Sequence, residues 1–184
     1  MEESNNIIRE IDPRTKIEII KNLDSNNNAN WLSVKIDHQI GFIKKKSITK
    51  FSIPNKCSSF QNFLDENLKK IGEPKILDSR RVSNKNNLEY DNFLERNSQS
   101  YTENAEYVKE DYYEGGSETL ILENISISEG LLIGINCNEL YSEIDFSFYK
   151  DSEKIDIQHP SGAFLWLSVK KVGKKTYIKY SSTS

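Results

Sequence analysis

The chain has few of the residues that mark the simplest function classes. Its 184 residues include 2 cysteines and 2 histidines. Cys57 and Cys137 are too few for a disulfide framework or a CxxC-type zinc site, and their spacing does not establish whether they pair. His38 and His159 have no Cys, Asp or Glu at metal-binding spacing. We therefore predict no metal site and no cofactor.

The chain also lacks an excess of basic charge and has no long apolar run. The formal net charge is -3 at pH 7, which argues against nucleic acid as a partner. No apolar run approaches the ~20 residues that span a bilayer, and the first ten residues do not resemble a secretory signal. We expect a soluble protein without a membrane span. With the sequence as it stands, we expect a cytoplasmic protein. If a leader peptide has been removed, the protein would be periplasmic or part of the cell envelope.

Length and composition allow one large or two small domains, of which we favour two, and the local patterns described below predict a β-dominated α+β protein. Only 36% of the residues are hydrophobic, while 29% are charged, so each core is modest. We expect a small N-terminal barrel over residues 1–54 and a helix followed by a polar linker over residues 55–104. An antiparallel sheet with one or two helices should occupy residues 105–184.

The clearest local pattern is the stretch from Trp31 to Ser47, which predicts a β-hairpin. With Asp37 and His38 as a two-residue turn, Ile36 pairs with Gln39, Val34 with Gly41, Ser33 with Phe42 and Leu32 with Ile43. Alternation then places an aliphatic set on one face and two aromatic rings on the other. The aliphatic set is Leu32, Val34, Ile36 and Ile43. Trp31 and Phe42 either pack under another segment or form a contact surface.

Residues 5–52 resemble the bacterial SH3-type domain. The resemblance rests on a strand at 16–20, then Trp31-x-x-Val34, a turn, and Gly41-Phe42-Ile43. Two features depart from the family pattern: the opening strand with Asn-x-Arg is absent before Ile7, and His38 stands where Gly is common. The resemblance implies an SH3-like barrel that binds peptides or cell-wall material, with Trp31 and Phe42 as contact residues.

After Pro54, the sequence predicts one helix and then little order. Ser58 or Ser59 can cap a helix whose apolar positions repeat at helical spacing. These positions are Phe60, Phe63, Leu64, Leu68 and Ile71. Gly72 and Pro74 should end the helix. Residues 73–104 are polar with scattered apolar anchors, so we expect a linker or a large mobile loop.

From residue 105 the sequence favours strands. Tyr107 to Tyr113 and Thr119 to Ile125 flank a glycine pair and predict a hairpin, and Tyr112 and Tyr113 are further candidate binding residues. Ser126 and Glu129 have capping-box spacing, which favours a helix over 128–140, although the alternation there also suits a strand. Further strands are predicted at 144–149, 154–158, 164–169 and 176–180, in an antiparallel sheet.

The segment Trp166-Leu167-Ser168-Val169-Lys170 repeats residues 31–35 letter for letter. Without gaps, the alignment continues to match Ile43 with Ile178 and Lys44 with Lys179. The C-terminal part is then either a second SH3-like unit or an unrelated hairpin that converged on the same pattern.

Two functions remain open. The first is a non-enzymatic binding protein that recognises a protein, a peptide or a cell-wall glycan, for example an immunity protein that neutralises a toxin. The second is an enzyme, because Cys57-Ser58-Ser59-Phe60 resembles the nucleophile segment of papain-like cell-wall endopeptidases, with His159 as the base. Lys56 and Ser59 replace the usual Asp and Gly of that motif. We favour the binding protein, and we assign no catalytic residue.

Overall fold

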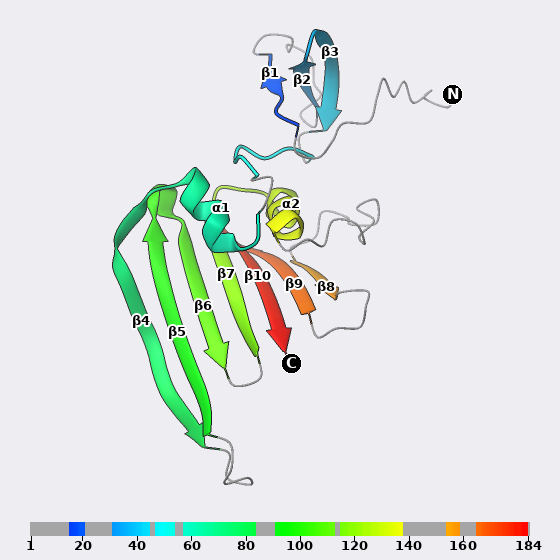
Figure 1. The fold of residues 1–184 in the computed structure, drawn as a ribbon. Helices are drawn as coiled ribbons and strands as arrows, with labels where there is room; N and C mark the ends of the chain where they lie inside the picture. The colour runs from blue at the N-terminus through cyan, green and yellow to red at the C-terminus, as the bar shows by residue number, and fades with distance from the viewer. Residues whose placement is uncertain are drawn as a thin grey trace. The chain divides into compact units, whose positions relative to one another are not determined.

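The computed structural model describes residues 15–20, 31–44, 47–53, 57–83, 91–112, 115–137, 154–158 and 165–183. The chain divides into two compact units, Met1–Ile48 and Thr49–Ser184. The described residues form two antiparallel sheets and two α-helices, so the protein is β-rich and of the α+β class (Figure 1). The strand predicted over 144–149 lies outside the described residues.

The N-terminal unit contains a three-stranded sheet in the order β1-β2-β3. Its strands are β1 (Glu18–Ile19), β2 (Trp31–Ile36) and β3 (Gln39–Lys44). The predicted hairpin register is confirmed, with Ser33 opposite Phe42 and Val34 opposite Gly41. Asp37 takes a φ of 56°, as the first position of a tight hairpin turn requires. The sheet is not closed among the described residues, so the SH3-like barrel stays a prediction.

The second unit contains a seven-stranded antiparallel sheet in the order β4-β5-β6-β7-β10-β9-β8. The strands are β4 (Lys70–Ser83), β5 (Asp91–Tyr101), β6 (Glu106–Tyr112), β7 (Gly115–Glu123), β8 (Lys154–Gln158), β9 (Leu165–Val172) and β10 (Lys175–Thr183). A short 3-10 turn, η2 (Thr102–Asn104), joins β5 to β6. The antiparallel sheet predicted for the C-terminal part is confirmed, and it extends further toward the N-terminus than predicted.

Two helices, α1 (Phe60–Asn67) and α2 (Ile127–Cys137), cover one face of this sheet (Figure 1). The Ser59 side chain caps α1 by accepting a hydrogen bond from the Asn62 N–H at 3.1 Å. The capping box of α2 is confirmed. Ser126 Oγ accepts from the Glu129 N–H at 3.1 Å, while Glu129 accepts from the Ser126 N–H at 2.9 Å.

The core lies between the helices and the sheet. Phe60, Phe63 and Leu64 of α1 are fully buried, as are Ile133 and Ile135 of α2. Leu120, Leu122, Leu167, Val169 and Ile178 contribute the sheet side of the same cluster. A disulfide between Cys57, just before α1, and Cys137, the last residue of α2, ties the two helices together.

Most of the predicted polar linker over 73–104 is strand instead, because β4 and β5 pair with each other as long antiparallel strands. The helix stops at Asn67, where Leu68 becomes extended, and Gly72 and Pro74 lie inside β4. The β4–β5 register shifts between Ile71 and Lys75, which accommodates the positive φ of Gly72 and the missing N–H of Pro74. Because β4 is an edge strand that buries little surface, its sequence shows no apolar alternation.

The repeated segment does not make a second SH3-like unit. Both copies are strands, but β9 lies between β8 and β10 within the large sheet. Trp166 pairs with Ser181, whereas an ungapped match to the Trp31–Lys44 pair would place it opposite Lys179. What the copies share is the local pattern of a strand with one buried face. Val34 and Val169 are buried, while Trp31 and Trp166 are partly exposed.

Candidate functional site

The first candidate site is the aromatic face of the N-terminal hairpin, defined by Trp31, Ile40 and Phe42. Trp31 is 38% exposed, Ile40 58% and Phe42 67%. The register places all three on one face of β2 and β3, together with Ser33 and Lys44. The Lys44 ammonium lies 5.5 Å from the centroid of the Trp31 ring. The face therefore offers apolar area beside a positive charge.

Ser33 lies at the centre of the aromatic face. It is only 4% exposed, and its hydroxyl is the one buried side-chain oxygen or nitrogen among the described residues that has no hydrogen-bond partner. A buried hydroxyl without a partner costs free energy. Because Ser33 is covered, its hydroxyl is not part of the exposed surface, and the exposed apolar part of the aromatic face is formed by Trp31, Ile40 and Phe42.

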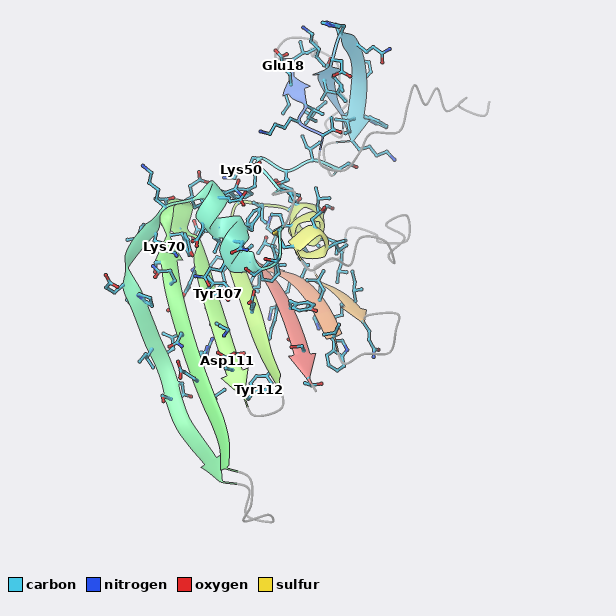
Figure 2. The ribbon with its side chains drawn as sticks, in the orientation of Figure 1. Glu18, Lys50, Lys70, Tyr107, Asp111 and Tyr112 are labelled. Carbon is cyan, nitrogen blue, oxygen red and sulfur yellow. A yellow bond between two sulfur atoms is a disulfide. The ribbon has the colours of Figure 1, made fainter. Side chains whose placement is uncertain are left out.

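The tyrosines predicted as binding residues are not part of this face. Tyr112 ends β6 in the second unit, where it pairs with Leu94 and Gly115 and is partly buried (Figure 2). Tyr113 lies outside the described residues. Of the predicted binding residues, the structure brings together Trp31 and Phe42.

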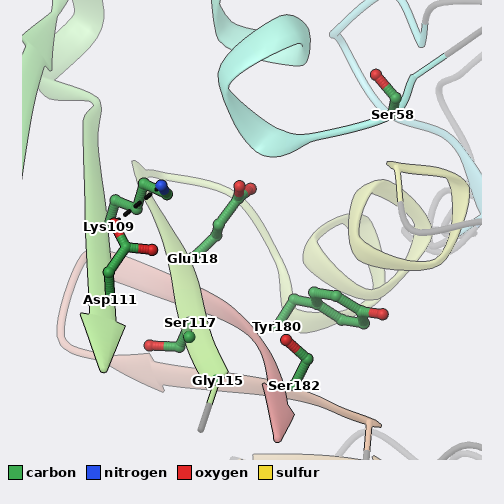
Figure 3. Close-up of a pocket in the computed structure, with 9 residues that line it drawn as sticks. Ser58, Lys109, Asp111, Gly115, Ser117, Glu118, Tyr180 and Ser182 are labelled. Atoms are coloured by element: carbon green, nitrogen blue, oxygen red, sulfur yellow. Dashed lines mark ion pairs between the residues drawn. The ribbon is translucent and has the colours of Figure 1, made fainter. Parts of the chain in front are cut away.

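A second candidate is a polar pocket of about 320 Å³ on the helix-covered face, beside the start of α1 (Figure 3). Its charged lining residues are Lys109, Asp111 and Glu118. Lys109 and Asp111 form an ion pair at 2.9 Å, and this contact with Asp111 outweighs partial burial and raises the pKa of Lys109. Glu118 accepts the Phe60 N–H at 3.3 Å. Because its pKa is raised, Lys109 is protonated at neutral pH and cannot serve as a nucleophile.

Two tyrosines near Glu118 also stay protonated, but for a different reason. Burial raises the pKa of Tyr107 and of Tyr180, and the negative charge of Glu118 raises both further. Burial and a hydrogen bond from its hydroxyl to Asp65 likewise raise the pKa of Tyr101. The hydroxyls of Tyr101 and Tyr107 donate hydrogen bonds to Asp65 and Glu118.

Cys57 is not a thiol in this structure. It is bonded to Cys137 and is 4% exposed. His159 lies outside the described residues. The disulfide removes the thiolate on which the endopeptidase alternative depends. The described residues also hold no cluster of three or more His, Cys, Asp or Glu side chains that could bind a metal ion.

The third candidate is the open face of the seven-stranded sheet, the face opposite α1 and α2. Leu120 and Ile178 point toward the helices, so Thr119, Ile121, Tyr177 and Lys179 point the other way. A hollow of about 600 Å³ lies on this face. Sequence reasoning missed it, because its residues come from six strands and each strand alone shows only an alternation of apolar and polar positions.

Glu110 contacts three other polar residues of the open face. It accepts hydrogen bonds from Ser117 at 2.9 Å and Lys179 at 3.1 Å, and it pairs with Arg96 at 3.2 Å. Burial alone would raise the pKa of Glu110, but the contacts with Ser117, Lys179 and Arg96 outweigh it and lower the pKa below its usual range. From the sequence alone, Glu110 is one of several acidic residues between Glu103 and Glu114, a pattern typical of a solvated acidic face. The structure places it in a network that joins β5, β6, β7 and β10.

Comparison with known proteins identifies no relative: no family model, no curated protein and no solved structure matches this chain. Among the described residues, no helix is both long enough and apolar enough to cross a membrane.

Proposed function

We propose that the chain is a non-enzymatic binding protein whose N-terminal unit, an SH3-like module, presents the aromatic face to a peptide, glycan or protein partner. The observation that carries the proposal is the adjacency of Trp31 and Phe42 on one face of a hairpin, 38% and 67% exposed. Large aromatic side chains supply much of the contact energy of binding surfaces. One example of such a partner is a toxin that this protein would neutralise as an immunity protein.

Phe42→Ala tests this proposal most sharply. Because Phe42 is largely exposed, its truncation should leave folding intact while reducing capture of the partner from native lysate or isolated cell wall by at least about tenfold. Ile19→Ala is the matched control, since Ile19 is also exposed but pairs with Val34 and so lies on the other face. Equal capture by both variants would place the binding surface elsewhere.

We also propose that the protein works in an oxidising compartment, such as the periplasm or cell envelope, rather than the cytoplasm. The support is the buried Cys57–Cys137 disulfide, since such bonds persist mainly outside the reducing cytosol. Thiol blocking in denaturant of the protein isolated from its native source, followed by mass spectrometry, should find both cysteines unmodified until a reductant is added. Labelling of both before reduction would exclude this compartment.

A further inference from the structure

The polar pocket beside the start of α1 is lined by hydroxyls with hydrogen-bonding capacity to spare. Alternation along β10 places Tyr180 and Ser182 on the same face as the buried Ile178, which is the pocket side of the sheet. Within the described residues, neither of these two hydroxyls makes a hydrogen bond. Ser58, just before α1, accepts one from Asn62 at 2.8 Å, which leaves its own hydrogen to donate. The pocket therefore offers three hydroxyl groups to a ligand.

The charged groups of the pocket are already satisfied within the protein. Lys109 and Asp111 form an ion pair at 2.9 Å, and Glu118 accepts hydrogen bonds from the Phe60 N–H and the Tyr107 hydroxyl. A ligand therefore does not need to supply a counter-ion. Each carboxylate still has acceptor positions left, because its two oxygens provide about four lone-pair sites. Hydroxyl groups of a neutral ligand would gain strong, charge-assisted hydrogen bonds there.

These groups surround the pocket from several strands (Figure 3). Lys109 and Asp111 belong to β6, Tyr180 and Ser182 to β10, and Glu118 to β7, which lies between them. The Tyr180 ring packs partly against the core and adds an aromatic surface to the polar lining. A volume of about 320 Å³ is at the small end of the range for ligand pockets, which suits a single ring.

We propose that this pocket binds a neutral sugar ring. A sugar hydroxyl donates and accepts hydrogen bonds at once, so several of them on one ring match a lining that mixes donors and acceptors. Asp111 and Glu118 accept from the sugar, while Tyr180 and Ser182 donate to it. An anionic ligand is disfavoured, because the charged lining consists of two carboxylates and one lysine. The site lies in the second unit and does not depend on the aromatic face.

The test is saturation-transfer-difference NMR of the full chain with glucose, galactose, mannose and N-acetylglucosamine, followed by titration of those that bind. We expect at least one to bind with a Kd of about 1 mM or tighter. Tyr180→Phe/Ser182→Ala keeps the ring but removes two hydroxyls, and should weaken binding at least about tenfold. Tyr177→Phe/Ser181→Ala makes the same changes on the opposite face of β10 and should leave binding unchanged.

Thermal unfolding shows whether the two double variants fold alike. Because both retain their apolar contacts, the Tm of each should stay within about 2 °C of the parent. No saturation transfer to any of the four sugars, or equal weakening in the two double variants, would overturn the proposal. Ethylamine that binds more tightly than every sugar would assign the pocket to a cationic group instead.

Discussion

In the N-terminal hairpin, Val34 and Phe42 should contribute very differently to stability. Val34 is 2% exposed on the aliphatic face. Val34→Ala removes buried methyl groups and should lower the free energy of unfolding by roughly 1–3 kcal/mol. Phe42→Ala, on the other face, should change it by less than about 0.5 kcal/mol. Urea denaturation of both variants checks this, and similar losses would mean that Phe42 packs under another segment.

The charge of Glu110 contributes to stability in a pH-dependent way. Since its pKa is lowered in the folded protein, its contribution is present above the pKa of the unfolded chain and is lost as the pH falls through the folded value. Glu110→Gln should therefore be less stable than the parent at pH 7. The loss of stability between about pH 5 and pH 3 should also be smaller in the variant.

Denaturation at a series of pH values measures this difference. Glu66→Gln is the control, because Glu66 is exposed on α1. A pH profile that is the same for Glu110→Gln and the parent would show that the Arg96 and Lys179 contacts contribute no net stability.

Among the secondary-structure elements, α2 packs closely against the sheet because of two glycines. A Cβ on Gly134 would lie 2.7 Å from Leu167 Cδ1, and one on Gly130 would lie 2.9 Å from Val169 Cγ1. The glycines weaken the helix by propensity, yet they let it approach β9 and β10 closely. Close packing, rather than helix propensity, explains why they are present.

Gly134→Ala should therefore destabilise the protein, although alanine favours a helix by about 1 kcal/mol. We expect a net loss of about 1–2 kcal/mol from overpacking against Leu167 and Ile178. Gln61→Ala, at an exposed position of α1, should be neutral within about 0.5 kcal/mol. A gain of stability in Gly134→Ala would show that the sheet side chains adjust at no cost.

The elements that could be predicted from the sequence are those with a local physical signal. The register of β2 and β3 follows from alternation around a two-residue turn, and α2 follows from its capping box despite the rival strand pattern. The β4–β5 hairpin gives no such signal. Its stability comes from backbone pairing at the sheet edge, with few buried side chains to mark it.

Functional residues, like the strands and helices, could be predicted only where the signal is local in the sequence. Trp31 and Phe42 are placed on one face by local alternation, so the sequence predicts their adjacency. The Cys57–Cys137 pair and the Glu110 network join segments far apart in the chain, and no spacing rule predicts such contacts. Sequence reasoning therefore left the pairing of Cys57 open and considered a hydrolase motif there only as an alternative, and it interpreted Glu110 as part of a solvated surface.

For the molecule as a whole, the disulfide is the main covalent constraint on the second unit. It closes a loop with a sequence separation of 80 residues, which restricts the unfolded chain strongly. Reduction should lower the free energy of unfolding by about 2–5 kcal/mol. Urea denaturation with and without dithiothreitol measures the effect. A Cys57→Ala/Cys137→Ala variant should unfold like the reduced protein and be insensitive to the reagent.

The position of β10 also determines when the large sheet can be completed. Of the strands described, β10 is the last in sequence, yet it lies between β7 and β9 in the middle of the sheet. A nascent chain on the ribosome therefore holds two unjoined strand edges until residues 175–183 emerge. Unjoined edges pair readily with other chains. Translation products that end before β10 should therefore be aggregation-prone, because the facing edges of β7 and β9 stay unpaired in them.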